Sequence, residues 1–326
     1  MKNGKLVALV LAGLLTAMSG SGSHAAMAYV SNERGDSVSV INTDAMKVVK
    51  TIQVGQRPRG IAASPDGAFI YVCLGDDNSI AVIDTKTMSV IGALPSGKDP
   101  EHLAVTPDGS TIYTSNENDS AASYIDVKSK KVLGTVSLGE EPEGVAVSAD
   151  GKLVAVTSEG SSLIHIIDNS SHKLLASVLV GARPRYAAFR ASGGELWATS
   201  EAGGTVSVID LKTDKVLQTI GFAVPGITAG LIQPVGINFT PDGTKAYVSL
   251  SRANRVAVID VKSRQVKKYI LVGQRVWHGD FTPDGKYFLC ANGVSNDVTV
   301  IDVASGRALK SISVGAAPWG VAIPPK

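Results

Sequence analysis

The sequence predicts an all-β fold, a seven-bladed β-propeller with four-stranded blades, on three observations. A Val-Ile-Asp motif at residues 82–84 returns at 208–210, 258–260 and 300–302, and its last position recurs every 42 residues with one interval of 50. A second column has the same spacing and contains Pro58, Pro100, Pro142, Pro184, Pro234, Val276 and Pro318. Each unit holds four short segments rich in β-branched residues. Four strands per repeat of this length are typical of a propeller blade.

The unit that follows Pro58 shows how one blade is built. Its four segments are residues 60–64, 69–74, 80–84 and 89–94. The Ser-Pro-Asp-Gly turn at 64–67 recurs, with threonine in first place, at 106–109, 240–243 and 282–285. Proline presets the first turn angle and glycine adopts the positive φ that the turn requires. The aspartate that ends the third strand is expected to cap the turn that follows it.

The two chain ends predict how the ring closes. Residues 318–323 supply a first strand and then the chain stops, whereas residues 27–54 supply strands two to four of a unit that lacks its first. The N- and C-terminal strands therefore share one blade, which leaves only short, protected strand edges. Residues 26–326 are predicted to form one domain. The interval of 50 places an eight-residue insertion between Gly221 and Pro234, either a lid or a longer loop.

Residues 1–25 have the pattern of a secretory signal peptide. Lys2 and Lys5 precede an apolar run at 6–18, and small residues lead to a predicted cleavage after Ala25. The apolar run is too short to span a bilayer. The product is expected to be a periplasmic protein with no membrane span.

The amino-acid composition limits the kinds of partner that the protein is expected to bind. With 44% hydrophobic and 18% charged residues the chain can bury a core, which excludes a disordered polymer. Removal of Lys2 and Lys5 lowers the count of basic residues from 31 to 29, equal to the 29 acidic ones. A neutral mature protein makes nucleic acid an improbable partner. The two cysteines, Cys73 and Cys290, fall in different blades and are predicted to be buried free thiols.

The second strands carry a further resemblance. The segments Tyr-Val-Ser-Asn at 29–32, Tyr-Thr-Ser-Asn at 113–116 and Tyr-Val-Ser-Leu at 247–250 resemble the repeats of the YVTN-repeat seven-bladed propellers. The signal segment and loops such as residues 55–60 are similar to those of exported propellers associated with PQQ-dependent catabolism. This resemblance implies an accessory role in periplasmic quinoprotein alcohol oxidation. The implied partner is a quinoprotein dehydrogenase or its electron-transfer partner.

The channel mouth is the expected site, because the first strand of each blade is innermost. Two residues after the proline column glycine is the rule, which indicates a crowded backbone near the axis. The exceptions are His102, Tyr186 and His278, residue types that bind metals or polar ligands. Either they bind a ligand, with His102 and His278 as candidate metal ligands, or they fill the channel and hydrogen-bond to one another.

Charged residues flank the proline column in a pattern. An acidic sector around Glu101 and Glu143 lies between arginines of the neighbouring blades. These charges either form inter-blade ion pairs, Arg59 with Glu101 and Glu143 with Arg185, or line a polar cup for a small anionic ligand or a partner's loop. In the second interpretation Trp277 and Trp319 form one wall. The candidate binding residues are Arg57, Arg59, Glu101, His102, Glu143, Arg183, Arg185, Tyr186, Arg275, Trp277, His278 and Trp319.

The motifs favour a binding module over an enzyme. The sequence has no Cys-x-x-Cys-His, no Gly-x-Ser-x-Gly and no phosphate-binding glycine loop, and no catalytic residue is assigned. One alternative is a metal-dependent hydrolase, similar to lactonase propellers, that uses Glu101, His102, Glu143 and His278. The separation of blades 2 and 6 around the ring argues against one shared ion. The other alternative is a propeller that holds a tetrapyrrole or another periplasmic cofactor.

Overall fold

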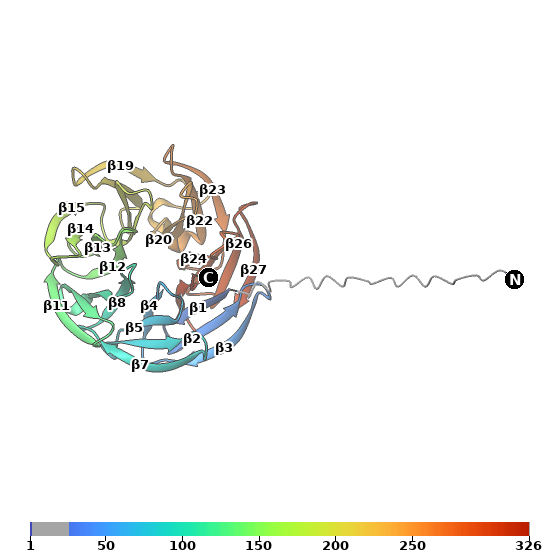
Figure 1. The fold of residues 1–326 in the computed structure, drawn as a ribbon. Helices are drawn as coiled ribbons and strands as arrows, with labels where there is room; N and C mark the ends of the chain where they lie inside the picture. The colour runs from blue at the N-terminus through green and yellow to red at the C-terminus, as the bar shows by residue number, and fades with distance from the viewer. Residues whose placement is uncertain (2–25, 326) are drawn as a thin grey trace.

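The described residues form seven four-stranded antiparallel sheets that radiate from a central axis (Figure 1). The computed structural model describes Met1 and residues 26–325. The predicted signal peptide therefore lies, apart from Met1, outside the described residues. The seven-bladed β-propeller fold is confirmed.

Blades are numbered from the one that follows Pro58. Blade 1 contains β4 (Pro58–Ala63), β5 (Phe69–Leu74), β6 (Ser79–Asp84) and β7 (Ser89–Pro95). Blade 2 contains β8 (Pro100–Val105), β9 (Thr111–Asn116), β10 (Ala121–Asp126) and β11 (Lys131–Ser137). Blade 3 contains β12 (Pro142–Val147), β13 (Leu153–Ser158), β14 (Leu163–Asp168) and β15 (Leu174–Leu179). Blade 4 contains β16 (Pro184–Phe189), β17 (Glu195–Ser200), β18 (Thr205–Asp210) and β19 (Lys215–Gly221).

The remaining blades follow the same order. Blade 5 contains β20 (Pro234–Phe239), β21 (Lys245–Leu250), β22 (Arg255–Asp260) and β23 (Gln265–Leu271). Blade 6 contains β24 (Val276–Phe281), β25 (Tyr287–Asn292), β26 (Asp297–Asp302) and β27 (Arg307–Ser313). Blade 7 contains β28 (Pro318–Ala322), β1 (Met27–Asn32), β2 (Ser37–Asn42) and β3 (Lys47–Gln53). Short 3-10 helices occur at η1 (Glu117–Asp119), η2 (Ala229–Leu231) and η3 (Ser251–Ala253).

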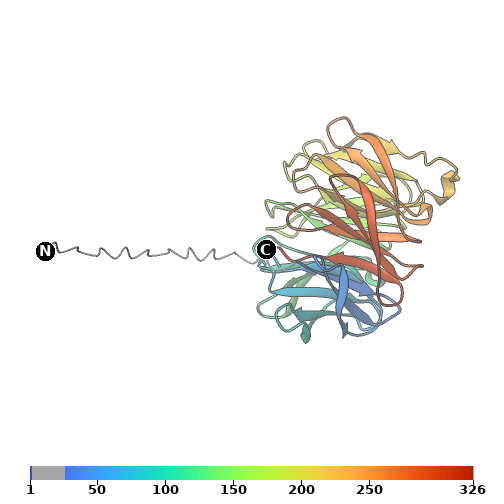
Figure 2. The same cartoon turned by 90° about the vertical axis from the view of Figure 1, so that its right-hand side faces the viewer.

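The ring closes as the sequence predicts, through a blade built from both chain ends. Strand β28 pairs with β1 in antiparallel register, with Val30 opposite Val321. The chain end at the C-terminus lies on one face of the ring, and the insertion before Pro234 projects from the other (Figure 2). Each inner strand is the axial edge of its own sheet, and it packs against the inner strands of both neighbouring blades.

The first strands begin two residues earlier than predicted, at the proline itself. In blade 1, Pro58 lies opposite Leu74, and the register shifts before Ile61 lies opposite Val72. Proline is tolerated here because it is the first residue of the strand, where the missing N–H removes no ladder hydrogen bond.

The predicted turn chemistry is confirmed. Gly67 has a φ of 70°, and its N–H donates to the Ser64 carbonyl oxygen at 2.9 Å. Asp84, which ends β6, accepts the Thr87 N–H at 2.7 Å and so caps the following turn. The same arrangement returns at Asp126, Asp168, Asp210, Asp260 and Asp302.

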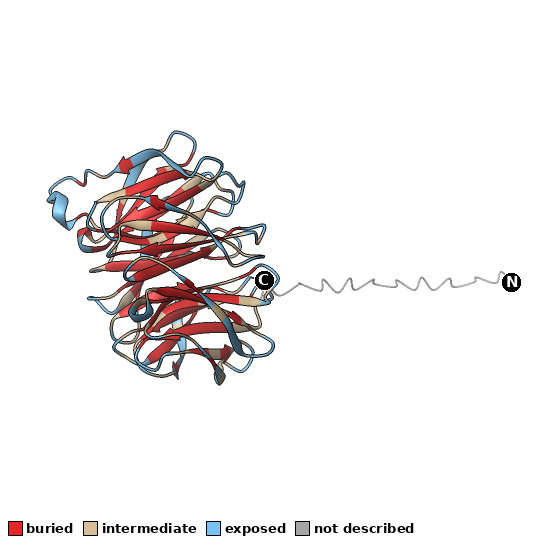
Figure 3. Cartoon of the chain, turned by 90° about the vertical axis from the view of Figure 1, so that its left-hand side faces the viewer, coloured by how far each residue is buried: buried red, intermediate tan, exposed pale blue. Residues whose placement is uncertain are grey.

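Burial is greatest in the middle of each blade and least in the outermost strands (Figure 3). The second and third strands of each blade are almost wholly buried, whereas in the outermost strands one residue, such as Ile220 in β19, packs inward. The core is therefore a set of apolar layers between adjacent blades. Cys73 and Cys290 lie in these layers as free thiols, as predicted, and burial raises the pKa of Cys73 to about 12. Within the described part of the chain, no helix is long and apolar enough to cross a membrane.

His165 in β14 is expected to make the stability depend on pH. It occupies the place that Ser39 and Ser123 hold in other blades. Its Nε2 accepts the Gly139 N–H at 3.1 Å, and its Nδ1 lies 2.8 Å from the Ser177 hydroxyl. Burial lowers the pKa of His165 to about 4, below the value of about 6.5 of an unfolded chain. Protons therefore bind the unfolded state first as the pH falls through this range.

We expect His165→Ser to remove this dependence. Between pH 6.5 and pH 4 the parent protein should lose roughly 2 kcal/mol of stability relative to the variant, after allowance for solvent screening. Urea unfolding of both proteins at several pH values measures the difference, and a constant offset from packing does not affect its slope. A difference that stays flat across this range would contradict the assigned neutral state of His165.

Candidate functional site

The strand-entry loops create a cavity of about 470 Å³ on one face of the ring, called here the charged mouth. Its charged lining consists of six arginines and two glutamates. Polar and apolar residues, among them Gln233, Trp277 and Val294, complete it. The charged residues are Glu33, Arg34, Arg59, Arg183, Arg185, Glu201, Arg252 and Arg275.

Glu101 is the centre of the first ion-pair group. Its side chain is fully buried, and its Oε1 lies 2.6 Å from Arg57 Nη2 while its other oxygen contacts Arg59. Arg57 also contacts Asp99, and Arg59 Nε lies 3.5 Å from Glu33. Burial lowers the pKa of Arg59, and neighbouring carboxylates oppose this shift.

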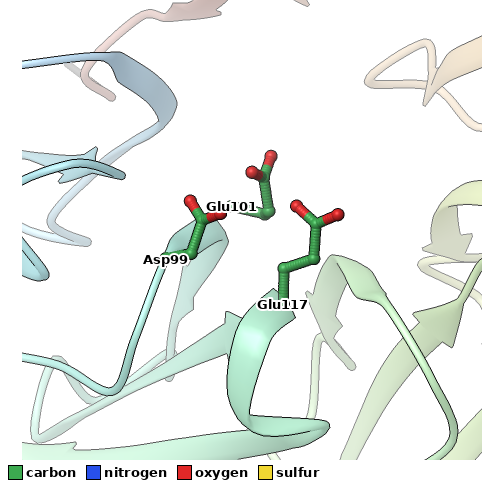
Figure 4. Close-up of side chains that lie close together, drawn as sticks. All are labelled: Asp99, Glu101 and Glu117. Carbon is green, nitrogen blue, oxygen red and sulfur yellow. The ribbon is translucent and has the colours of Figure 1, made fainter.

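Three carboxylates of blade 2 come together beside this group (Figure 4). Oxygens of Asp99, Glu101 and Glu117 lie within 4.8 Å of one another. Arg57 supplies the positive charge for the first two. Burial, and then the charge of Glu143, raises the pKa of Glu117. The cluster is therefore part of an ion-pair network whose resident cation is a guanidinium.

Arg185 is the centre of the second group and is buried. Its Nη2 lies 2.7 Å from Glu143 and its Nε 3.8 Å from Glu201, and it also contacts Glu159. These three carboxylates raise the pKa of Arg185 although burial acts in the opposite direction. At Glu159, burial and the charge of Glu143 raise the pKa more than the charge of Arg185 lowers it, and the pKa rises to about 7. Arg183, which is half exposed, also contacts Glu159, with its Nε 2.7 Å from the Glu159 Oε2.

Both ion pairs named from the sequence are therefore present, and they are buried rather than exposed. The acids Glu159 and Glu201 were missed. They belong to a third column with the same spacing, one residue after the second strand: Glu33, Gly75, Glu117, Glu159, Glu201, Ser251 and Gly293. This column was readable from the sequence, and it supplies the inner partners of the arginines.

Three arginines at the charged mouth differ from the others. Among the residues that the structure describes, no carboxylate lies within ion-pair distance of Arg34, Arg252 or Arg275. The acid column helps to explain two of them, because blades 5 and 6 have Ser251 and Gly293 where blades 2, 3, 4 and 7 have glutamate. Blade 1 also lacks this glutamate, but its Arg57 contacts Glu101 of blade 2. Arg275 lies over the Trp277 ring at 4.7 Å. Burial, and then the charge of Arg252, lowers the pKa of Arg275.

The two tryptophans lie below the guanidinium groups. Trp277 lines the charged mouth and is contacted by Arg185 at 5.3 Å as well as by Arg275. Trp319 is 1% exposed and lies under Arg59 at 5.1 Å. They thus form a floor beneath the arginines, where cation–π contacts hold the guanidinium planes.

His102, Tyr186 and His278 meet on the axis, one level below the charged mouth. The ring centroids of His102 and Tyr186 are 4.7 Å apart, those of Tyr186 and His278 5.2 Å, and those of His102 and His278 5.5 Å. The expectation that the two histidines are far apart was wrong, because the inner strands converge and long side chains cross the axis. Trp319 completes the ring cluster at 4.3 Å from His278.

Both histidines are neutral at pH 7. Burial lowers the pKa of His102 to about 4 and that of His278 well below its usual range. The four residues considered for a hydrolase do not share one cavity. Glu101 and Glu143 are bound to arginines at the mouth, and His102 and His278 line a hollow on the other side of the ring cluster.

The insertion before Pro234 is anchored to the propeller rather than laid across its opening. Val224 and Ile232 are buried in the apolar layer between blades 4 and 5, and the Ala223 N–H donates to the Tyr269 hydroxyl at 2.9 Å. Within the described residues, Gln233 alone of this segment lines the charged mouth.

Comparisons with known proteins show the family and the fold. A family model described as YNCE-like beta-propeller matches residues 90–284. No curated protein shows significant similarity in sequence. Hydrazine synthase of Kuenenia stuttgartiensis is similar with a TM-score of 0.72 and 20% identity, over 81% of this chain and 89% of that chain.

Two further solved structures are similar. A candidate 6-phosphogluconolactonase of Bacteroides fragilis matches with a TM-score of 0.78 and 19% identity, over 93% of this chain and 99% of that chain. The dihydro-heme d1 dehydrogenase NirN, in complex with DHE, matches with a TM-score of 0.66 and 16% identity, over 90% of this chain and 74% of that chain. At such identities the likeness concerns the fold alone.

Proposed function

Because the chain belongs to the YNCE-like β-propeller family, whose description names a fold and no activity, we propose its function from the charged mouth. The protein is a non-catalytic binding module that takes a small organic anion, such as a carboxylate, at this cavity. The observation that carries the proposal is the set of three arginines, Arg34, Arg252 and Arg275, that lack a carboxylate partner among the described residues.

The charge balance of the cavity supports an anion. Six arginines line it, and its two glutamates already face other arginines: Glu33 faces Arg57 and Arg59, and Glu201 faces Arg183 and Arg185. Guanidinium groups bind carboxylates through two parallel hydrogen bonds, which gives both affinity and orientation. The repulsion between Arg252 and Arg275 would be relieved by a bound anion. The volume of about 470 Å³ suits a small molecule.

The cellular role we propose follows from the motifs. The predicted signal peptide and the YVTN-type segments favour an exported, periplasmic accessory of PQQ-dependent alcohol catabolism. In that role a quinoprotein dehydrogenase, or its electron-transfer partner, would be the protein partner. Growth of a deletion strain on an alcohol as sole carbon source tests this role separately from ligand binding, since unchanged growth would contradict it.

Citrate is the probe for the charged mouth. We expect isothermal titration calorimetry to show citrate binding that weakens about tenfold or more in the Arg252→Gln/Arg275→Gln double variant, because two charge-assisted contacts are lost. The double variant should fold normally, since neither side chain neutralises a buried carboxylate.

Arg307→Gln is the matched control, because it removes one exposed charge in β27, outside the cavity lining. This variant should bind citrate like the parent protein. Equal losses in the control and the double variant would mean a general charge effect, and absence of citrate binding by the parent would overturn the proposal. Native mass spectrometry of protein from its own host would then identify the resident anion.

A further inference from the structure

The opposite end of the channel contains a second hollow. Two adjoining cavities of about 550 and 320 Å³ share a set of lining residues and are together called here the lower vestibule. It opens on the face where the chain ends, since Pro325 contributes to its wall, and the insertion projects from the other face (Figure 2). The shared lining residues are Ile61, Ala62, Ala63, His102, Tyr186, Asn238 and Asp280.

The wall of the lower vestibule is aliphatic and its only charge is negative. Inner-strand residues such as Leu103, Val145 and Ile237 supply the wall, and Phe189 lies among them. Among the described lining residues, Asp280 is the single charged group. The charged mouth has the opposite character, and no described residue lines both cavities.

Three polar side chains of the ring cluster, those of His102, Tyr186 and His278, line this hollow. His102 Nδ1 lies 3.1 Å from the Leu103 carbonyl oxygen, so Nδ1 carries the proton and Nε2 is a free acceptor. Within the described chain, neither the ring nitrogens of His278 nor the Tyr186 hydroxyl has a hydrogen-bond partner. His102 and His278 are 6% and 7% exposed, so water does not easily compensate them.

Asp280 lies beside these atoms. It follows His278 by two residues in β24, and both line the same cavity. Its oxygens accept the Phe281 N–H at 2.8 Å and the Ile323 N–H at 2.9 Å, and each keeps a lone pair for another donor. Burial raises the pKa of Asp280 to about 7, and the Asp280 charge adds to the raised pKa of Tyr186. An ionised carboxylate in this place lacks a counter-cation.

We propose that the lower vestibule binds a primary alkylammonium ion. The ammonium group has three donors, which match the Asp280 carboxylate and the acceptor nitrogens of His102 and His278. The ring of Tyr186 adds a cation–π contact. The alkyl chain lies along the aliphatic wall, where burial of its methylene groups contributes to affinity.

This site is independent of the proposed anion site. The ring cluster of His102, Tyr186, His278 and Trp319 lies between the two cavities, and the two linings have opposite charge. The two ends of one channel thus select ligands of opposite sign. Loss of either site leaves the other intact.

Hexylammonium and 1-hexanol, which differ in the charged head, provide the test. At pH 8, where Asp280 is largely ionised, we expect calorimetry to show that hexylammonium binds at least about tenfold more tightly than 1-hexanol. Asp280→Asn should remove most of this preference. Asp242→Asn, at an exposed turn outside the shared lining, is the matched control and should keep it.

A second variant guards against misfolding of the first. Ala62→Phe places a ring in the shared wall and should abolish hexylammonium binding without removing any polar group. The Arg252→Gln/Arg275→Gln variant should bind hexylammonium normally. Equal affinity for hexylammonium and 1-hexanol, binding that survives both Asp280→Asn and Ala62→Phe, or displacement of hexylammonium by equimolar Zn²⁺ would each overturn the proposal.

Discussion

Replacement of Arg185 by alanine is expected to lower the free energy of unfolding by about 3–5 kcal/mol at pH 8. Arg185 is buried and contacts Glu143, Glu159 and Glu201. Its removal leaves three carboxylates with little solvent: Glu159 and Glu201 keep the half-exposed Arg183, and Glu143 keeps no described ion-pair partner. The contact with the Trp277 ring is lost as well. Urea unfolding followed by tryptophan fluorescence measures the change.

The loss of unfolding free energy in Arg185→Ala should become smaller as the pH falls. The pKa of Glu159 is already about 7 in the presence of Arg185, and it rises further without it. The folded variant therefore binds protons that the folded parent does not, so the deficit shrinks as the pH falls from 8 to 5. Arg183→Ala removes a side chain that is 54% exposed and should cost less than about 1 kcal/mol. Equal effects of the two substitutions would show that burial does not govern this network.

The fold was predictable because its information is local and repeated. The proline column, the Val-Ile-Asp strand and the Pro-Asp-Gly turn each specify backbone geometry within a few residues, and the recurrence of each in several blades reinforces the prediction. Closure by β28 and β1 followed from the missing first strand of the unit at the N-terminus. Strand bounds moved by one or two residues, most at the start of β4, because the bulge after Pro58 leaves no mark in the hydrophobic pattern.

The residues of the site could be predicted from the sequence, but which arginine pairs with which carboxylate could not. Sequence places Arg57 and Arg275 at equivalent loop positions, before Pro58 and Val276, yet Arg57 binds Glu101 and Arg275 has no described carboxylate partner. That difference depends on the residue after the proline in the next blade, which is Glu101 for the blade that follows Arg57 and Trp319 for the blade that follows Arg275. The distance between His102 and His278 depends on how far side chains reach across the axis. Asp280 was missed, although it stands four residues after the proline position, where five blades have alanine.

The glycine column two residues after the proline lies where adjacent inner strands approach each other closely. A Cβ built on Gly144 would lie 2.5 Å from the Arg185 carbonyl oxygen and 2.7 Å from Tyr186 Cα, and one on Gly60 would lie 2.6 Å from His102 Cα. These neighbours are backbone atoms of the next inner strand, so a side chain cannot simply rotate away. The sequence prediction of a close approach at this column is confirmed. Glycine is needed here for space between blades.

Gly144→Ala is accordingly expected to lower the free energy of unfolding by about 3 kcal/mol, the upper part of the usual range for an overpacked interior. The added methyl group must displace β16, which carries both Arg185 and Tyr186, so the near-ultraviolet circular dichroism of the ring cluster should change too. Gly221→Ala is the matched control: it has open space around its Cβ at the end of the outer strand β19, and reduced freedom of the unfolded chain should raise its stability by up to about 1 kcal/mol. If both alanines leave the stability unchanged, the inner strands can separate freely, and the close contact between blades does not hold the ring together.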